Sequence, residues 1–269
     1  MQYQTFSPSP GLADLIDCYW TLDDDADSPA AKQTIVPDGR MEMIFHLGDL
    51  YQQYLPDDTS IIQPRSFVIG QLTRPLTIEP MGRTAIFAVR FQHDGMLPWL
   101  SVPLKELENR AVALEQLYGK DGLALERQIQ AASSVDDRIA ITGNFLTNRL
   151  GSTDEIVARA VDTLLEANGQ VTVKDICQPL PIDRRQLERR FSASVGLSPK
   201  QLGRIIRFQS VIRRLLDGQF SSFTSLAYDG DYYDQAHFIR DFKEFTGYTP
   251  REFYGDNLRM SSLFYGTQD

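Results

Sequence analysis

Two segments of this chain repeat one pattern. The first is RRQLERRFSASVGLSPKQL, beginning at Arg184, and the second is DQAHFIRDFKEFTGYTPREF, beginning at Asp234. Five positions of the two segments match at a constant spacing of 51 residues: Leu187 with Phe238, Arg189 with Arg240, Phe191 with Phe242, Gly196 with Gly247, and Pro199 with Pro250. A fixed spacing over five positions indicates an internal repeat and predicts two structural units of the same design.

The residues around the repeat predict that each unit is a helix-turn-helix. Before the first segment, residues 173–177 form a short helical pattern, and 178–181 contain two prolines that turn the chain. Asp183 is suited to cap the helix that follows. Residues 200–216 predict a long connecting helix, and 223–228 followed by 234–245 repeat the pair of helices.

The N-terminal half has a different texture. Up to about residue 91 the segments are short and alternating, as in Met41–Leu47, which predicts strands of a barrel or sandwich. From Leu97 onward, apolar residues recur every three or four positions and predict helices. The break at 151–153 predicts a boundary. We therefore expect an α+β chain with a β-rich sensor or oligomerisation domain (1–125), a helical linker region (126–152), an all-α domain (153–257) and a C-terminal tail (258–269).

The net charge of −9 is unevenly distributed. Residues 1–152 hold 12 basic and 20 acidic side chains, whereas residues 153–255 hold 14 of each. Within the second half, residues 184–214 carry nine basic residues against one acid, Glu188. A basic surplus on one segment of an acidic chain is typical of a surface that binds phosphates.

These residues identify a resemblance. Residues 153–255 resemble the DNA-binding domain of the AraC/XylS family of bacterial transcription regulators. The resemblance is carried by Arg185, Leu187, Arg189 and Phe191, by Gly196-x-Ser-Pro199, by the connecting helix, and by the second segment from Tyr233 to Pro250. It implies two helix-turn-helix subdomains that each place one recognition helix in a major groove of double-stranded DNA.

Helical spacing predicts which side chains face that groove. Leu187 with Phe191, and Phe238 with Phe242, are the core pairs, so the intervening positions point away from the core. The predicted DNA-binding residues are Arg184, Arg185, Glu188, Arg189, Arg190, Gln235, His237, Arg240 and Lys243.

Roles follow from side-chain chemistry, since Arg can bond two acceptors of guanine. Arg185, Arg189 and Arg240 are predicted at base edges, and Arg184, Arg190 and Lys243 at phosphates. Glu188 either accepts from cytosine or orients a neighbouring arginine, and His237 either contacts the groove or packs on the protein. Acidic residues around the second recognition helix (Asp229, Asp231, Asp234, Asp241 and Glu244) predict that the second unit binds DNA more weakly than the first.

In the N-terminal half, Val36–Gly39, Met43–Leu47 and Val89–Phe91 resemble the cupin-like sensor region of some AraC-family regulators. Glu42, His46 and Arg90 lie on strand faces that could hold a small-molecule effector if those faces are interior. If those faces are exterior, these residues are ordinary surface. A third possibility is that the N-terminal half binds no ligand and only dimerises or contacts RNA polymerase. Helices between Val102 and Leu150 carry an apolar stripe that predicts either a homodimer or packing on the barrel or on the DNA-binding domain.

An enzyme is the least favoured reading. Cupin metal chemistry needs clustered His and carboxylate ligands, whereas the three histidines (His46, His93 and His237) are scattered. No nucleophile elbow or phosphate-binding glycine loop is present, so we expect no catalytic residue, metal or cofactor. The chain shows no signal peptide or membrane-spanning run, and Cys18 and Cys177 are expected as free thiols. We expect a cytoplasmic bacterial protein that associates with the nucleoid when bound to DNA.

Overall fold

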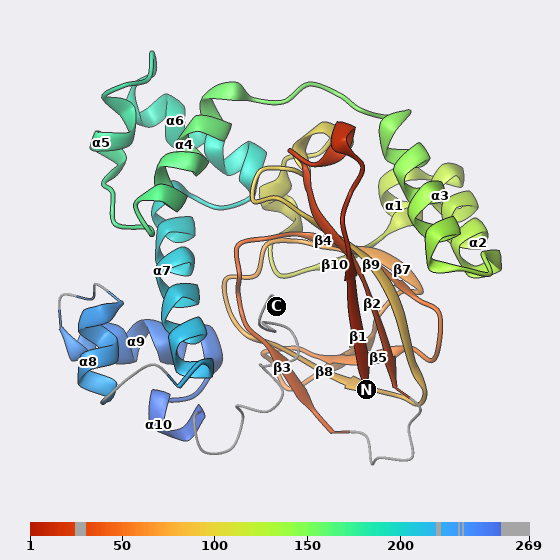
Figure 1. The fold of residues 1–269 in the computed structure, drawn as a ribbon, viewed down its shortest axis with the longest axis horizontal. Coiled ribbons are helices and arrows are strands. Elements are labelled where there is room, and N and C mark those ends of the chain that lie inside the picture. The colour runs from red at the N-terminus through yellow and green to blue at the C-terminus, as the bar shows by residue number, and fades with distance from the viewer. Residues whose placement is uncertain (25–30, 219–221, 231, 233, 254–269) are drawn as a thin grey trace.

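The computed structural model describes residues 1–24, 31–218, 222–230, 232 and 234–253. It has a β-barrel-like N-terminal domain and a helical C-terminal domain, joined by an extended segment that crosses over between them (Figure 1). The predicted C-terminal tail, 258–269, lies outside the described residues. Among the described helices, none is both long and apolar enough to cross a bilayer. Cys18 and Cys177 are both free thiols.

The N-terminal domain consists of two antiparallel sheets. The larger has the strand order β1 (Gln2–Phe6), β2 (Ile16–Asp24), β9 (Thr84–Phe91), β4 (Glu42–His46), β7 (Ser66–Ile69) and β10 (Ala111–Ala113). The smaller has the order β3 (Gln33–Ile35), β8 (Leu76–Pro80), β5 (Tyr51–Tyr54) and β6 (Ser60–Ile62). The predicted β-rich architecture, a barrel or sandwich followed by helices, is confirmed.

Strand β4 shows why the two faces of the larger sheet differ. Successive side chains of a strand point to opposite faces. Met43 and Phe45 are fully buried in the domain's main apolar core. Glu42, Ile44 and His46 face the other side, where they line a cavity enclosed by both sheets. The face that the sequence left ambiguous is therefore interior.

Short helices cover the outer side of the larger sheet. They are η1 (Pro10–Leu12), η2 (Leu97–Trp99), η3 (Leu104–Leu107), α1 (Leu114–Tyr118), α2 (Lys120–Ala131) and α3 (Val135–Thr147). Leu125 and Ile129 of α2 and Leu146 of α3 are buried in the same core as β4. The predicted boundary at 125/126 thus falls inside a helix that packs on the barrel.

One local expectation was wrong. Ala111 belongs to strand β10, not to a helix, because Val112 pairs with Val68 and extends the larger sheet. Asn109, with φ of 56°, turns the chain into this strand, and its side chain binds Thr73. Short apolar runs fit a helix or a strand equally well, and tertiary pairing decides this one.

The C-terminal domain has the two predicted helix-turn-helix units. Its helices are α4 (Glu155–Glu166), α5 (Val173–Cys177), α6 (Arg184–Val195), α7 (Pro199–Leu216), α8 (Phe223–Asp229), α9 (Gln235–Thr246) and α10 (Pro250–Glu252). Asp183 caps α6 by accepting from the Gln186 backbone N–H, and Asp234 caps α9 in the same way through His237. Gly196 and Gly247 end these helices in the left-handed region, with φ of 84° and 80°, where glycine is favoured.

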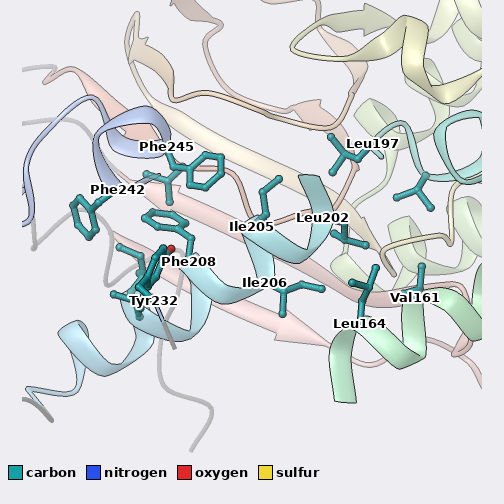
Figure 2. Packing of buried hydrophobic residues seen from close by; sticks show 14 of the residues in the cluster. Val161, Leu164, Leu197, Leu202, Ile205, Ile206, Phe208, Tyr232, Phe242 and Phe245 are labelled. Carbon is teal, nitrogen blue, oxygen red and sulfur yellow. The ribbon is translucent and has the colours of Figure 1, made fainter. Parts of the chain in front are cut away.

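The long helix α7 joins both units into one apolar core. Figure 2 shows Leu202 and Ile206 of α7 on the side of Leu164 in α4, and Phe208 among the aromatic rings of the second unit. The Phe208 ring contacts Phe242 edge-on at 5.6 Å between centroids. Because α7 has one side buried from Pro199 to Leu215, it fixes the spacing of the two units.

Candidate nucleic-acid interface and barrel cavity

The first recognition helix, α6, exposes the predicted DNA-facing side chains. Leu187 and Phe191 are fully buried, as the helical spacing predicts. Arg185 and Arg189 are exposed, and neither side chain forms an ion pair or a hydrogen bond with the described part of the chain. Both guanidinium groups are therefore available to an anionic or acceptor-rich partner.

Two other arginines of α6 are held by carboxylates. The Arg184 Nε donates to Glu188 Oε1 at 2.9 Å, one helical turn away. Of the two roles considered for Glu188, this contact favours orienting an arginine. Arg190 donates two hydrogen bonds to Asp154, at 2.6 and 2.8 Å. Because Asp154 also caps α4, Arg190 ties the two helices together, and a phosphate would have to compete with that carboxylate.

The second recognition helix, α9, presents a smaller free set. Gln235, Arg240 and Lys243 are exposed, and their side chains form no hydrogen bond or ion pair with other described residues. The His237 ring lies edge-on against Tyr232, with centroids 5.3 Å apart, and its Nε2 is 3.7 Å from Asp241. These contacts favour the packing role for His237.

The acidic ring expected around α9 is largely neutralised. Asp241 is buried and accepts from Arg204 of α7 at 2.8 Å, and Glu244 accepts from the same guanidinium at 2.6 Å. Asp234 is committed to its helix cap. The side chains of Asp229 and Asp231 lie outside the described residues. Arg204 therefore pairs with two of the acidic residues around α9 and no longer contributes its own charge to the predicted basic surface. As a result, the two helix-turn-helix units differ less in charge than the sequence suggests.

The second feature is the cavity inside the barrel. Both sheets contribute apolar side chains to its wall, including Trp20, Ile44, Phe67, Ile69, Ile78 and Ile86. Its volume, measured as the space open to the centre of a water molecule, is about 90 Å³. Glu42, His46 and Arg90, the residues predicted for ligand binding, all lie in this wall.

One end of the cavity is charged. Arg90 forms ion pairs with Asp38 and, at 3.5 Å, with Glu42. Asp17 accepts from Arg40 and lies 4.0 Å from Arg90. Burial raises the pKa of Glu42 to about 7, against the opposing effect of Arg90 and with a further increase from Asp38.

The other polar region is neutral. His46 Nε2 lies 3.2 Å from Gln63 Oε1, and Gln63 donates its own amide N–H to Gln53. Burial lowers the pKa of His46 to about 4, so the ring is neutral at physiological pH. Because Gln63 offers an oxygen, the proton of the neutral ring sits on Nε2, and Nδ1 is an acceptor. Nδ1 has no partner.

A loop connects the cavity to the helical domain. Val36, Asp38 and Arg40 line the cavity, while Val36 also belongs to the apolar core of the C-terminal domain. The carbonyl of Pro37, which lies between Val36 and Asp38, accepts a hydrogen bond of 2.6 Å from the Gln209 side chain of α7. The Gly39 carbonyl is held by Gln71 and by His93. One five-residue loop, 36–40, therefore touches both the cavity and α7.

Sequence reasoning missed several wall residues. Asp38 belongs to a Pro-Asp-Gly segment that reads only as a turn, and its contact with Arg90 spans 52 residues. Gln33 comes from a strand too short to show a clear alternation, and Gln63 lies just after the end of another three-residue strand, β6. Within the described residues, no cluster of three His, Cys, Asp or Glu side chains could hold a metal ion.

Comparison with known proteins divides the chain in the same way. Residues 4–113 match the model of a domain of unknown function, DUF6597, and residues 176–255 match that of a helix-turn-helix domain. The HTH-type transcriptional regulator ArgR of Pseudomonas aeruginosa is 33% identical over 109 residues. That match covers 40% of this chain and 32% of the length of ArgR.

Solved structures match over nearly the whole chain. ToxT from Vibrio cholerae superposes with a TM-score of 0.50 and 14% identity, covering 97% of this chain and 99% of ToxT. The AraC-like transcriptional activator CuxR covers 85% of this chain and 89% of its own, with 15% identity and a TM-score of 0.33. The order of domains, a β-rich half followed by two helix-turn-helix units, is thus that of ToxT. Residues 176–255 belong to the AraC-type helix-turn-helix family, and this chain joins that domain to an N-terminal domain of the DUF6597 family.

Proposed function

We propose that this protein is a sequence-specific DNA-binding transcription regulator, and that a small molecule in the barrel cavity controls its affinity for DNA. The observation that carries the DNA-binding half of the proposal is the shared arrangement of two capped helices, α6 and α9, on one rigid connecting helix. Each exposes an arginine, Arg189 or Arg240, at the same position of the repeat.

The two helices suit duplex DNA by geometry and charge. An α-helix fits the major groove, where exposed arginines bond guanine. Because one side of α7 packs on both units along its whole length, the helix sets a fixed distance between them, as two successive major-groove faces about 34 Å apart require. In the first helix-turn-helix unit, Arg185 and Arg189 supply the side chains that contact DNA. In the second unit, Arg240 and Lys243 supply them.

The loop 36–40 supports the effector half of the proposal. A ligand that displaces Asp38 or Arg40 acts on the same loop that Gln209 holds from α7. A ligand shifts a conformational equilibrium only through contacts that differ between the two states. The loop offers such contacts, because Asp38 and Arg40 face the cavity, whereas the Val36 side chain and the Pro37 carbonyl contact the DNA-binding domain.

The first experiment tests sequence-specific binding. A duplex is selected from a random pool by the wild-type protein, and its affinity is measured by fluorescence anisotropy against a shuffled duplex of equal length. The proposal predicts tighter binding to the selected duplex, by about 10³-fold or more, and a steep loss of affinity with salt. Equal affinity for both duplexes, or a flat salt response, would contradict it.

A second experiment tests whether the cavity controls DNA binding. Ile44→Trp fills the cavity from its wall without adding charge, and Ile62→Trp places the same residue on an exposed strand. The proposal predicts a changed DNA affinity for Ile44→Trp alone. If both variants bind DNA like the wild type, the protein is a ligand-independent regulator, which is the rival reading.

Further partners stay predictions. The apolar stripe that predicted a homodimer is partly used inside the protein, since Leu125, Ile129 and Leu146 pack on the barrel. Light scattering of the free protein and of its DNA complex gives the number of chains in each. Contact with RNA polymerase, and association with the nucleoid in the cytoplasm, follow from the proposed role in transcription.

A further inference from the structure

Most of the buried polar atoms in the cavity wall that lack a hydrogen-bond partner within the described residues are acceptors. Considering only the described residues, three polar atoms of wall side chains are buried without a hydrogen-bond partner: Trp20 Nε1, Gln33 Oε1 and His46 Nδ1. Of these, only Trp20 Nε1 is a donor, and the Glu42 carboxyl lies beside it. The other two atoms, Gln33 Oε1 and Nδ1 of the neutral His46 ring, are acceptors, and no described residue donates a hydrogen bond to them.

The charged end is also biased toward acceptors. Three carboxylates, from Asp17, Asp38 and Glu42, meet two guanidinium groups, from Arg40 and Arg90. The stronger contacts join Arg40 with Asp17 and Arg90 with Asp38, so Glu42, at 3.5 Å, is the carboxylate in surplus. A second anion placed here would meet this surplus, and the described residues at this end of the cavity include no unpaired cation to receive it.

Glu42 is also a carboxylate that a ligand in the cavity can reach. Its side chain retains 18% of its accessible surface, yet it is surrounded deeply enough that burial is the main cause of its raised pKa. Its open surface therefore faces the cavity. On the same strand face, the apolar Ile44 follows Glu42 at the next inward position.

The size of the cavity limits the ligand. One water molecule needs roughly 10–15 Å³ of space on this measure, so 90 Å³ holds several waters or one compact organic molecule. A long acyl chain does not fit without rearrangement of the wall. The apolar side chains around Ile44 suit a flat or branched hydrocarbon body.

We propose that the cavity binds a compact apolar molecule carrying a protonated amine, with the ammonium group on Glu42 and the hydrocarbon body against Trp20, Ile44 and Phe67. An ammonium group has three donors and no acceptor, so it matches the surplus carboxylate and leaves no acceptor of its own unpaired. This assignment rests on the proposed function only in taking the cavity as the ligand site.

Three probes of nearly equal size test the assignment: 2-phenylethylamine, 2-phenylethanol and phenylacetate. Binding to the full-length protein is measured by isothermal titration calorimetry at pH 7.5. The amine is expected to bind more tightly than the alcohol by about tenfold or more, and phenylacetate is expected not to bind. A carboxylate that binds as well as the amine overturns the assignment, and so does a failure of all three probes to bind.

A pair of variants tests the role of Glu42. Glu42→Gln keeps the shape and removes the charge, and Glu115→Gln makes the same change at an exposed position of α1. Glu42→Gln is expected to reduce the affinity for 2-phenylethylamine by about tenfold or more and to leave that for 2-phenylethanol nearly unchanged. Equal loss for both probes would show a damaged cavity rather than a lost ion pair, and would overturn the assignment.

The same titrations separate this inference from the proposed function. DNA affinity is measured with and without a saturating concentration of 2-phenylethylamine. If the amine binds in a Glu42-dependent manner while DNA affinity stays constant, the ligand class stands and the effector role fails. If the carboxylate binds instead and changes DNA affinity, the effector role stands and the amine assignment fails.

Discussion

The Gln209 side chain donates a hydrogen bond to the Pro37 carbonyl, with 2.6 Å between Nε2 and the oxygen. These residues lie 172 positions apart and join the connecting helix α7 to the loop 36–40 of the barrel. On either side of Pro37, Val36 packs into the C-terminal core and Asp38 faces the cavity. The cavity and the DNA-binding domain therefore share one short loop.

Breaking this contact should uncouple the cavity from DNA binding. Gln209→Leu keeps a side chain of similar size and removes the donor. We expect that the DNA affinity change caused by Ile44→Trp becomes smaller when both substitutions are combined, because the loop no longer transmits it to α7. A double-mutant cycle measured by anisotropy gives the coupling directly. Gln128→Leu, on the exposed face of α2, is the control. If the effects of Gln209→Leu and Ile44→Trp on DNA affinity are additive, the contact between Gln209 and Pro37 does not couple the cavity to DNA binding.

Gly39 is predicted to be intolerant of any side chain. It has φ of 77°, and a Cβ built there would lie 2.7 Å from Leu202 Cδ1. Gly119 has φ of 58° with open space around it, so Gly119→Ala measures backbone strain alone. We expect Gly39→Ala to lose about 1–3 kcal/mol more unfolding free energy than Gly119→Ala, the usual effect of overpacking. Urea unfolding checks the difference, and equal losses would contradict a close approach of the loop to α7.

Arg204 is predicted to hold the second unit on α7. Its guanidinium bonds Asp241, whose side chain is 2% exposed, and also Glu244. Arg204→Met keeps the apolar stem but leaves a buried carboxylate unpaired, which typically costs about 3–5 kcal/mol. Arg213→Met, at an exposed position of the same helix, should change the free energy of unfolding by well under about 1 kcal/mol.

The ion pair itself can be separated from packing. Combining Arg204→Met with Asp241→Asn removes both charges, so most of the lost unfolding free energy should return. A double variant that is no more stable than Arg204→Met would contradict the role assigned to the buried charge.

His46 should make the fold sensitive to acid. Burial lowers its pKa to about 4 from an ordinary value of 6.5, so between pH 6.5 and 4 the unfolded chain binds a proton that the folded chain does not. Stability is therefore lost as the pH falls through this window. His93, also with a pKa of about 4, acts in the same direction. Glu42 acts oppositely, because its pKa of about 7 lets the folded state take up a proton first.

Removing His46 should flatten the pH profile. In His46→Gln, His93 and Glu42 remain and largely offset each other. The loss of unfolding free energy between pH 6.5 and 4.5 should become shallower by about 1 kcal/mol per pH unit. Chemical unfolding at a series of pH values checks this slope, with His237→Gln as the control for removing a histidine from outside the barrel. An unchanged slope would show that His46 is not buried as a neutral ring.

The sequence predicts local elements better than long-range contacts. The repeat fixes Leu187 and Phe191 as core positions because helical spacing alone determines which face is buried. The place of Ala111 depends on a strand that begins more than 40 residues earlier, so periodicity misassigns it. The pairing of Arg204 with Asp241 was invisible for the same reason, and both were counted as free charges. The alternation along β4 showed that Glu42 and His46 share a face, but only the second sheet shows that this face is interior.

The most direct test of the account is the DNA affinity of Arg189→Ala and Arg240→Ala. Anisotropy titrations use the duplex selected by the wild type, with Arg127→Ala on α2 as a control of equal charge change at an exposed site. Both recognition-helix variants should lose on the order of 1–3 kcal/mol of discrimination between the selected and shuffled duplexes, while Arg127→Ala keeps the wild-type ratio. Wild-type discrimination in both variants would contradict the assignment of α6 and α9 as the DNA-reading helices.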